Sequence, residues 1–228
     1  RKINVVLISL PHEGLPEMAT QLMKYSIEVA WYETDLTVHE NVRLVTDWIN
    51  DHFSVSLLIN NAGMGGTKRF IEADTDYINR IIQLNVMSTS LITRALVHNL
   101  MRQPRAYILN VASMAAFSPM GFKTVYPASK AFIHHFTRGL YQELRDTNVF
   151  VSVVNPGPMK TNHDATTRIN RQGLFGRLGL LSPEKVAAIS IRQLFKRDTM
   201  IMLGWGNGIS WLLMKVLPIW VRLPLLTK

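Results

Sequence analysis

A tyrosine and a lysine four residues apart are the first pair of side chains in this sequence that could carry out acid–base chemistry. Tyr126 and Lys130 belong to the segment YPASK, which opens a stretch of helical periodicity. This spacing places both side chains on one face of a helix. Because a nearby cation favours the phenolate, we expect Lys130 to lower the pKa of Tyr126 toward the range of a general acid or base. The same pair also occurs in ordinary helices, as a core residue beside a solvated one.

Further polar residues stand where predicted strands end. Ser113 comes two residues after the predicted strand Ala106–Val111, and the segments NNAG (60–63) and NPG (155–157) end two other strands. Ligands of open parallel sheets bind at the carboxyl ends of the strands, so these residues are candidates for one site. Ser113 could instead satisfy the backbone of a turn. Asn85 lies inside a predicted helix, which is unfavourable for asparagine unless its side chain has a specific task.

These residues, in this order, resemble the motifs of the short-chain dehydrogenases/reductases, which are nicotinamide-dependent oxidoreductases on a single Rossmann domain. The resemblance covers nearly the whole chain. It implies that Tyr126 exchanges a proton with the carbonyl oxygen of the substrate and that Ser113 polarises the same oxygen. For Lys130 it implies contact with the nicotinamide ribose and a lowered Tyr126 pKa. For Asn85 it implies support of a water-linked proton relay to that lysine.

The resemblance also implies a set of cofactor-binding residues. An acid after the second predicted strand contacts the adenine region, the NAG segment walls the site, and the segment after the fifth strand lies at the nicotinamide carboxamide. The implied residues are Ser9, Asp35, Leu36, Asn61, Ala62, Gly63, Tyr126, Lys130, Pro156, Gly157, Met159 and Thr161.

The choice between NAD and NADP depends, in such proteins, on the residue that ends the strand Asn4–Ser9. An acid there binds the ribose 2′-hydroxyl of NAD, whereas an arginine nearby favours the 2′-phosphate of NADP. Ser9 and Leu10 provide neither signal. Because no acid would repel a 2′-phosphate, we expect NADP rather than NAD.

Short runs rich in β-branched residues alternate with helical patterns, which is typical of a parallel sheet covered by helices on both faces. The predicted strands are Asn4–Ser9, Glu28–Glu33, Val55–Asn60, Ala106–Val111, Val149–Val154 and Met200–Leu203. The predicted helices are Pro16–Tyr25, Val42–Phe53, Thr75–Met101, Val125–Asp146 and Pro183–Phe195. We therefore expect an α/β fold, a Rossmann-type doubly wound parallel sheet with three α/β/α layers, in one domain over residues 1–228.

One element of that fold is not found in the sequence. A strand followed by a glycine-rich TGxxxGxG loop should come first, but the strand Asn4–Ser9 resembles the second one. The first strand would lie centrally, beside Val55–Asn60, and without it backbone groups would be unpaired. We therefore expect that this strand and its loop are truncated or unobserved. The glycines at 63–66 follow the wrong strand for that loop, and those at 204–208 are predicted to form a turn.

Composition excludes several other classes of protein. The 228 residues include no cysteine, which excludes disulfide scaffolds, Cys-ligated metals and Cys nucleophiles and suits a reducing cytoplasm. Neither a signal peptide nor an uninterrupted membrane-spanning run is visible. The histidines lack ligand spacing, so no metal is expected, and His134 and His135 are expected on a helix surface. Without a recognition motif, no nucleic-acid partner is expected.

The net charge of +9 is concentrated at one end of the chain. From Lys160 onward, eleven Lys and Arg stand against three acids. This distribution suits a nucleic acid, an anionic membrane surface, an acidic carrier or phosphate, or a merely solubilising surface. Residues 204–228 combine an apolar stripe with tryptophans and basic residues, which is typical of a helix lying in a membrane interface. The same segment could instead cover the substrate pocket or pack on a partner subunit.

The apolar residues near the predicted site favour a large, lipid-like ketone or alcohol as substrate. They include the C-terminal segment and Leu174, Phe175, Leu178, Leu180 and Leu181 in a predicted loop. The resemblance to membrane-associated hydroxysteroid and keto-lipid reductases favours the same substrate class. Two alternatives stay open, namely a 3-oxoacyl-carrier-protein reductase and a non-catalytic nicotinamide-nucleotide-binding protein. We expect a cytoplasmic homodimer, peripheral on the membrane, because relatives commonly dimerise through helices that match Thr75–Met101 and Val125–Asp146.

Overall fold

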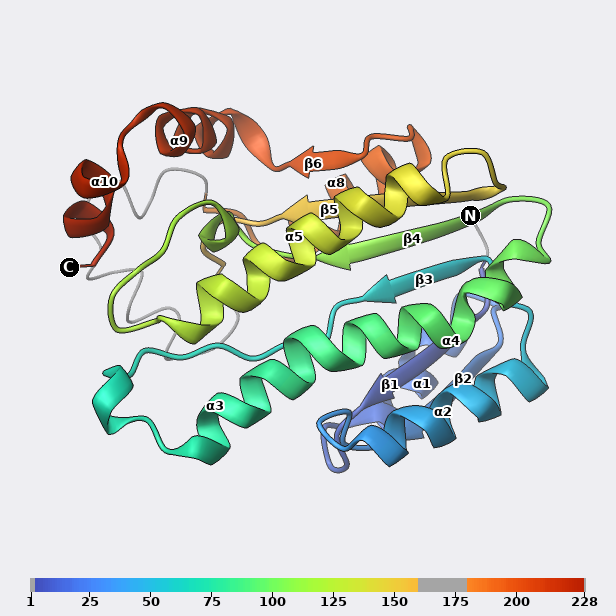
Figure 1. Ribbon diagram of the computed structural model, residues 1–228. Coiled ribbons are helices and arrows are strands. Elements are labelled where there is room, and N and C mark those ends of the chain that lie inside the picture. Colours follow the sequence, from blue (N-terminus) through green and yellow to red (C-terminus); the bar gives the residue numbers. More distant parts are fainter. Residues whose placement is uncertain (1–2, 160–179, 228) are drawn as a thin grey trace.

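The computed structural model describes residues 3–159 and 180–227, in which parallel strands form two sheets (Figure 1). One sheet pairs β1 with β2, and the other has the order β3-β4-β5-β6. The strands are β1 (Val5–Ser9), β2 (Val29–Glu33), β3 (Leu57–Asn60), β4 (Ala106–Val111), β5 (Val149–Asn155) and β6 (Met200–Met202). Each lies within one or two residues of a predicted strand.

The two sheets are separated where the family resemblance implies a further central strand. Among the described residues, β1 pairs only with β2, and β3 pairs only with β4. The strand order is otherwise that of the expected doubly wound sheet. All pairings are parallel, so the carboxyl ends of the strands within each sheet lie at one edge.

Helices cover both faces of the larger sheet. The helices are α1 (Leu15–Met23), α2 (His39–His52), α3 (Thr75–Ile82), α4 (Thr89–Met101), α5 (Val125–Glu143), α8 (Pro183–Phe195), α9 (Gly204–Val216) and α10 (Ile219–Leu226). Tyr107 and Leu109 of β4 pack in a core that includes Leu194 of α8. Ile108, between them, packs with Leu100 of α4 and belongs to a second core. This alternation confirms the predicted three-layer α/β/α arrangement.

The long predicted helix Thr75–Met101 is interrupted. A π-helical turn, Gln83–Ser88, separates α3 from α4. Asn85 lies in this turn with 1% of its surface exposed. Periodicity cannot show such a turn, because it inserts a single extra residue into an otherwise helical stretch.

The prediction of a turn at residues 204–208 is wrong. Gly204 begins α9, and the glycines occupy its first turn. Asn207 of this turn is buried and donates a hydrogen bond to the carbonyl of Leu203 at 2.7 Å. A Cβ on Gly157 would lie 2.6 Å from Asn207 Oδ1, so this helix packs closely on the chain after β5. Tertiary packing thus overrides the low helix propensity of glycine.

Candidate active site

Three polar side chains meet at the carboxyl edge of the larger sheet, just after β4. Ser113 caps the short 3₁₀ helix Met114–Phe117, and its Oγ accepts a hydrogen bond from the Ala115 amide at 3.1 Å. Tyr126 lies in the first turn of α5, and its hydroxyl is hydrogen-bonded to that of Ser113. Lys130 follows one turn later on the same helix and is buried. The structure thus brings together the three residues that could act on a carbonyl group.

The pKa of Tyr126 differs from the expectation. Burial raises the pKa of its phenol above the ordinary value, and the hydrogen bond with Ser113 opposes this rise. The Lys130 amine donates to the Val111 carbonyl oxygen at 2.9 Å, and burial lowers the pKa of this amine to about 8. The prediction that Lys130 lowers the Tyr126 pKa is therefore wrong for this arrangement, because desolvation is the dominant effect on both groups.

Asn85 fastens the loop after β3 to the start of α5. Its Oδ1 accepts a hydrogen bond from the Met64 amide at 2.8 Å, and its Nδ2 donates to the Met64 carbonyl at 2.9 Å. The same Nδ2 donates to Ser129 Oγ at 2.8 Å, and Ser129 in turn donates to the Tyr126 carbonyl at 2.8 Å. Sequence reasoning missed Ser129, although its place directly before Lys130 in YPASK was an available signal.

The loop after β3 passes close to these side chains. A Cβ on Gly63 would lie 3.2 Å from both Asn85 Oδ1 and Lys130 Nζ. A Cβ on Gly65 would lie 3.0 Å from the nearest atom of the Tyr126 ring. A larger residue at either position would therefore have to displace the neighbouring side chain slightly, and Gly65 is a second residue that sequence reasoning did not assign to the site.

The same edge fits the ribose and nicotinamide part of a dinucleotide. Asn61, Ala62 and Gly63 are exposed at the end of β3. Gly63 leaves free the space beside Lys130 Nζ that a Cβ would fill. Lys130 could donate to ribose hydroxyls there, since an ammonium carries three donors and an amine two.

Of the residues expected at the adenine side, Ser9 and Asp35 stand at the carboxyl ends of β1 and β2. Ser9 Oγ donates to the Leu10 carbonyl at 3.0 Å. One carboxylate oxygen of Asp35 accepts from the Thr37 amide at 2.8 Å and so shapes the turn before α2. The side chain of Leu36 is buried in the core beside α2, so only its backbone could contact a ligand.

The segment after β5 is described only in part. Pro156 is buried, and its carbonyl oxygen accepts from the Met114 amide at 2.8 Å. Gly157 packs against α9, as described above. Met159 forms a bridge with Leu181. Thr161 lies outside the described residues, as do Leu174, Phe175 and Leu178 of the predicted substrate loop.

Two expectations about neighbouring residues need correction. His134 does not lie on the helix surface: it is buried, with its Nδ1 3.2 Å from Asn155 Oδ1 and its ring 4.9 Å from that of Phe117. Burial lowers the pKa of His134. Leu181 packs against the core between the larger sheet and α8, so its side chain is engaged there. Among residues 3–159 and 180–227, no cluster of His, Asp and Glu could hold a metal ion.

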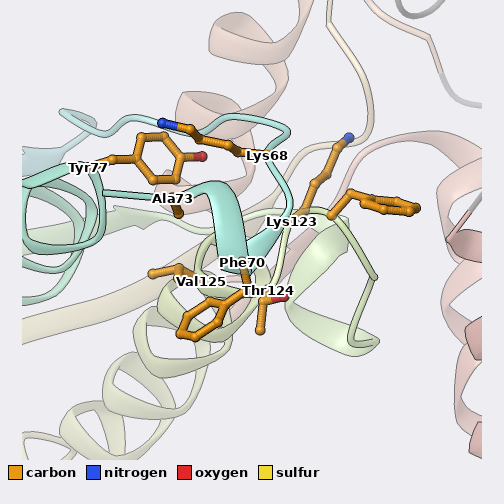
Figure 2. Close-up of a pocket in the computed structure, with 8 residues that line it drawn as sticks. Lys68, Phe70, Ala73, Tyr77, Lys123, Thr124 and Val125 are labelled. Atoms are coloured by element: carbon orange, nitrogen blue, oxygen red, sulfur yellow. The ribbon is translucent and has the colours of Figure 1, made fainter. Parts of the chain in front are cut away.

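A surface hollow lies beside the candidate catalytic residues rather than at them. A small cavity is lined by residues from the loop before α3, from α3 itself and from the start of α5, among them Phe70, Tyr77 and Val125 (Figure 2). An open hollow of about 310 Å³ adjoins it, lined by Arg69, Phe70, Ile71, Phe122 and Thr124. Ser113, Tyr126 and Lys130 line neither.

Known proteins similar to this chain share both its sequence pattern and its fold. A family model described as short chain dehydrogenase matches residues 1–172. An uncharacterized oxidoreductase of Staphylococcus epidermidis is 30% identical over 159 residues, which are 69% of this chain and 68% of that protein. A similar protein of Staphylococcus saprophyticus is 28% identical over 193 residues, 83% of this chain and 79% of its own length.

Solved structures with the same fold are more distant in sequence. A 7β-hydroxysteroid dehydrogenase has a TM-score of 0.81 at 20% identity, covering 94% of this chain and 82% of that one. An enzyme of Sphingobium yanoikuyae in complex with NADPH has a TM-score of 0.76 at 21% identity, covering 94% and 87%. One of Burkholderia phymatum in complex with NAD has a TM-score of 0.78 at 22% identity, covering 92% and 83%. With the family match, the chain belongs to the short-chain dehydrogenase/reductase family of oxidoreductases.

Proposed function

We propose that Tyr126 and Ser113 bind the carbonyl oxygen of a large apolar substrate, and that Tyr126 gives this oxygen a proton as the carbonyl is reduced. The observation that carries the proposal is the hydrogen-bonded Ser113–Tyr126 pair with Lys130 one helical turn away. A nicotinamide dinucleotide bound at this edge would supply the hydride, or accept it in the reverse reaction.

The chain's own residues divide this task in a simple way. The Ser113 hydroxyl donates a hydrogen bond to the carbonyl oxygen, where negative charge develops. A phenol whose pKa is raised by burial keeps its proton at neutral pH and can therefore act as the acid. Lys130 contacts ribose hydroxyls beside Gly63, and a shift of its amine from the Val111 carbonyl toward Tyr126 would favour the phenolate left after proton transfer.

We propose Asn85 as a positioning residue for the same site. Its three hydrogen bonds join Met64 to Ser129, and Ser129 is bonded to the backbone of Tyr126. Asn85 would also support a water-linked proton path to Lys130, in keeping with the family pattern. The other proposed cofactor-binding residues are those expected from the sequence, except that Leu36 would contact the cofactor through its backbone alone.

NADP is the proposed cofactor. Support comes from Ser9 at the end of β1, which offers no carboxylate against a 2′-phosphate. Neighbours in fold bind either form, as the complexes with NADPH and with NAD illustrate. Saturation with NADPH at a concentration well below that needed for NADH would support this choice.

A bulky, lipid-like ketone or alcohol is the proposed substrate. Helix α9 contacts the short helix that Ser113 caps, and its Trp211 packs edge-on against Phe117 with their ring centroids 6.5 Å apart. Neighbours in fold include the 7β-hydroxysteroid dehydrogenase and a bulky-bulky ketone specific alcohol dehydrogenase of Comamonas testosteroni. We further propose a cytoplasmic homodimer in contact through the helical segment Thr75–Met101 and α5, where Met87 of the π-helical turn and Phe132 of α5 are exposed.

The test of the proposed function is the Tyr126→Phe variant, assayed with NADPH and a set of steroid and long-chain ketones. We expect carbonyl reduction to fall by about 10²- to 10⁴-fold, because the proton donor is lost, while NADPH binding measured by fluorescence stays unchanged. The matched control is Tyr25→Phe, at an exposed site after α1, which should retain full activity. Unaltered turnover in Tyr126→Phe would reject the proposal, and a wild type that binds NADPH but reduces no ketone would favour a non-catalytic binder.

A further inference from the structure

Large apolar side chains are exposed around the carboxyl edge of the sheet, beside the catalytic residues. Ile71 is 87% exposed and Trp220 is 75% exposed, in segments far apart in the sequence. We call this set the apolar rim. It comprises Phe70, Ile71, Phe122, Trp220, Leu223 and Leu225. Figure 1 shows α10 and the short helix before α3 at the end of the molecule toward which the strands point.

Hydrogen bonds join the segments of the apolar rim into one surface. The Gly121 amide donates to Thr227 Oγ1 at 3.0 Å, which fixes the end of α10 beside Phe122. The Lys68 amide donates to the Phe122 carbonyl at 2.7 Å, which holds the loop before Phe70 against the same residue.

Arg222 adds a further tie between the C-terminal helices and the site. Its guanidinium donates to the Phe117 carbonyl at 3.0 Å and also to the Met214 carbonyl. Phe117 closes the 3₁₀ helix that Ser113 caps. The apolar rim is therefore continuous with the wall of the catalytic site, and its position is set by ordered contacts.

Phe122 is held in a conformation that a bulky residue adopts at a cost. Its φ is +59°, in the left-handed region, and its side chain is 43% exposed. Such a backbone is strained for a residue that is not glycine. An exposed aromatic ring gives little burial in return, so the strain is understandable if the ring is covered by a ligand or a surface.

The charges around the apolar rim favour an anionic surface as that partner. Residues 204–227 contain Lys215 and Arg222 and no acid. Lys215 is exposed, with its amine 5.0 Å from the centre of the Trp211 ring. On the facing loop, the Arg69 guanidinium lies 5.8 Å from the Phe122 ring centre.

The acids of the loop before α3 form ion pairs with basic residues of the same loop. Glu72 lies 3.9 Å from Arg69, and Asp74 pairs with Lys68 at 2.9 Å. Tryptophan and other apolar side chains beside basic residues are what the interface of a lipid bilayer attracts. In the described part of the chain no helix is long and apolar enough to cross a bilayer, so the contact would be at its surface.

We propose that the apolar rim docks on the surface of an anionic lipid bilayer. Trp220 and Leu225 of α10 and Phe70, Ile71 and Phe122 of the loops enter the interface, while Lys215 meets anionic headgroups. The edge of the sheet that carries Ser113 and Tyr126 then lies next to the lipid. A lipid-like substrate could pass from the bilayer to Tyr126 without crossing water, which deepens the proposed function.

The test measures binding of the whole chain to vesicles of phosphatidylcholine with phosphatidylserine by co-sedimentation. The double variant Ile71→Ser/Trp220→Ser removes two exposed apolar side chains, so we expect its binding to fall by about tenfold or more. The matched control is Tyr25→Ser/Leu44→Ser, exposed positions on or near α1 and α2, which should bind as the wild type does. Lys215→Glu should weaken binding to these vesicles with no loss on vesicles of phosphatidylcholine alone.

Three results would overturn the proposal. The wild type could remain in the supernatant, the rim variant could bind as tightly as the wild type, or the rim variant could instead dissociate a dimer in sedimentation analysis, which would make a second copy the occupant. Circular dichroism of each variant checks that the fold is retained. Vesicle binding needs no turnover, so its failure would leave the proposed function intact, and loss of activity in Tyr126→Phe would leave vesicle binding intact.

Discussion

At the scale of single residues, the close approach of Gly65 to the Tyr126 ring leaves little room for a larger side chain. A Cβ at Gly65 would lie 3.0 and 3.1 Å from two ring carbons, closer than ordinary packing allows. We therefore expect Gly65→Ala to shift the phenol and lower kcat about tenfold or more, because catalysis depends on placement to within about 1 Å.

The matched control for Gly65→Ala is Gly139→Ala on the same helix as Tyr126. No atom lies within 4 Å of a Cβ built there, and the position is helical, so kcat should be unchanged. Stability should rise by about 0.5–1 kcal/mol from the better helix propensity of alanine. Full activity in Gly65→Ala, measured by steady-state kinetics, would show that the loop after β3 does not position the phenol.

The sequence was sufficient to find Ser113, Tyr126 and Lys130 but not their electrostatics. Spacing places Tyr126 and Lys130 on one helix face, yet it cannot show that the Lys130 amine turns to the Val111 carbonyl. Burial, which decides both pKa directions, depends on the whole fold. The same reason explains His134, whose neighbour Asn155 comes from another element.

At the scale of elements, Asn99 of α4 joins α2 to the segment before β3. Its Oδ1 accepts from the Val55 amide at 2.9 Å, and its Nδ2 donates to Asn50 Oδ1 at 3.1 Å and to the Phe53 carbonyl at 2.9 Å. The side chain is 2% exposed. Asn99→Ala should lower the free energy of unfolding by about 3 kcal/mol in urea denaturation, since buried backbone groups lose their partners.

The control for Asn99 is Asn79→Ala, at an exposed position in α3. Alanine has the better helix propensity, so we expect no loss of stability there. If the free energy of unfolding changed little, and equally, in Asn99→Ala and Asn79→Ala, the structural role assigned to Asn99 would be contradicted.

The elements themselves were largely predictable. The strand Ala106–Val111 and the helix Pro183–Phe195 begin and end where the sequence predicts. The π-helical turn at Asn85 and the start of α9 at Gly204 were not predictable, because each depends on packing against a distant segment. A hydrogen bond to the Met64 carbonyl holds Asn85 in the π-helical turn, and Gly157 packs against Asn207 in the first turn of α9.

At the scale of the whole molecule, the burial of Lys130 should make stability depend on pH. Burial lowers the pKa of its amine to about 8 from 10.5. Between these values the unfolded chain binds a proton that the folded chain does not, so stability increases as the pH rises through this window. From pH 8 to 9.5 we expect the free energy of unfolding to rise by about 2 kcal/mol relative to Lys130→Met.

The raised pKa of Tyr126 acts in the opposite direction at higher pH. Above about pH 10 the unfolded chain releases the phenol proton while the folded chain keeps it, so stability decreases there.

The control for the Lys130 prediction is Lys185→Met, at an exposed position of α8. If Lys130→Met showed the same pH dependence between 8 and 9.5 as the wild type and this control, the assigned burial of Lys130 would be contradicted.

The measurement that tests the account most directly is a crystal structure of this chain with NADPH and a bulky ketone or its alcohol. We expect the substrate oxygen to lie about 2.6–3.2 Å from both Ser113 Oγ and the Tyr126 hydroxyl. Lys130 Nζ should contact the ribose, and the reacting carbon should lie against the nicotinamide. A nicotinamide ring or a substrate oxygen bound away from Tyr126 would contradict it.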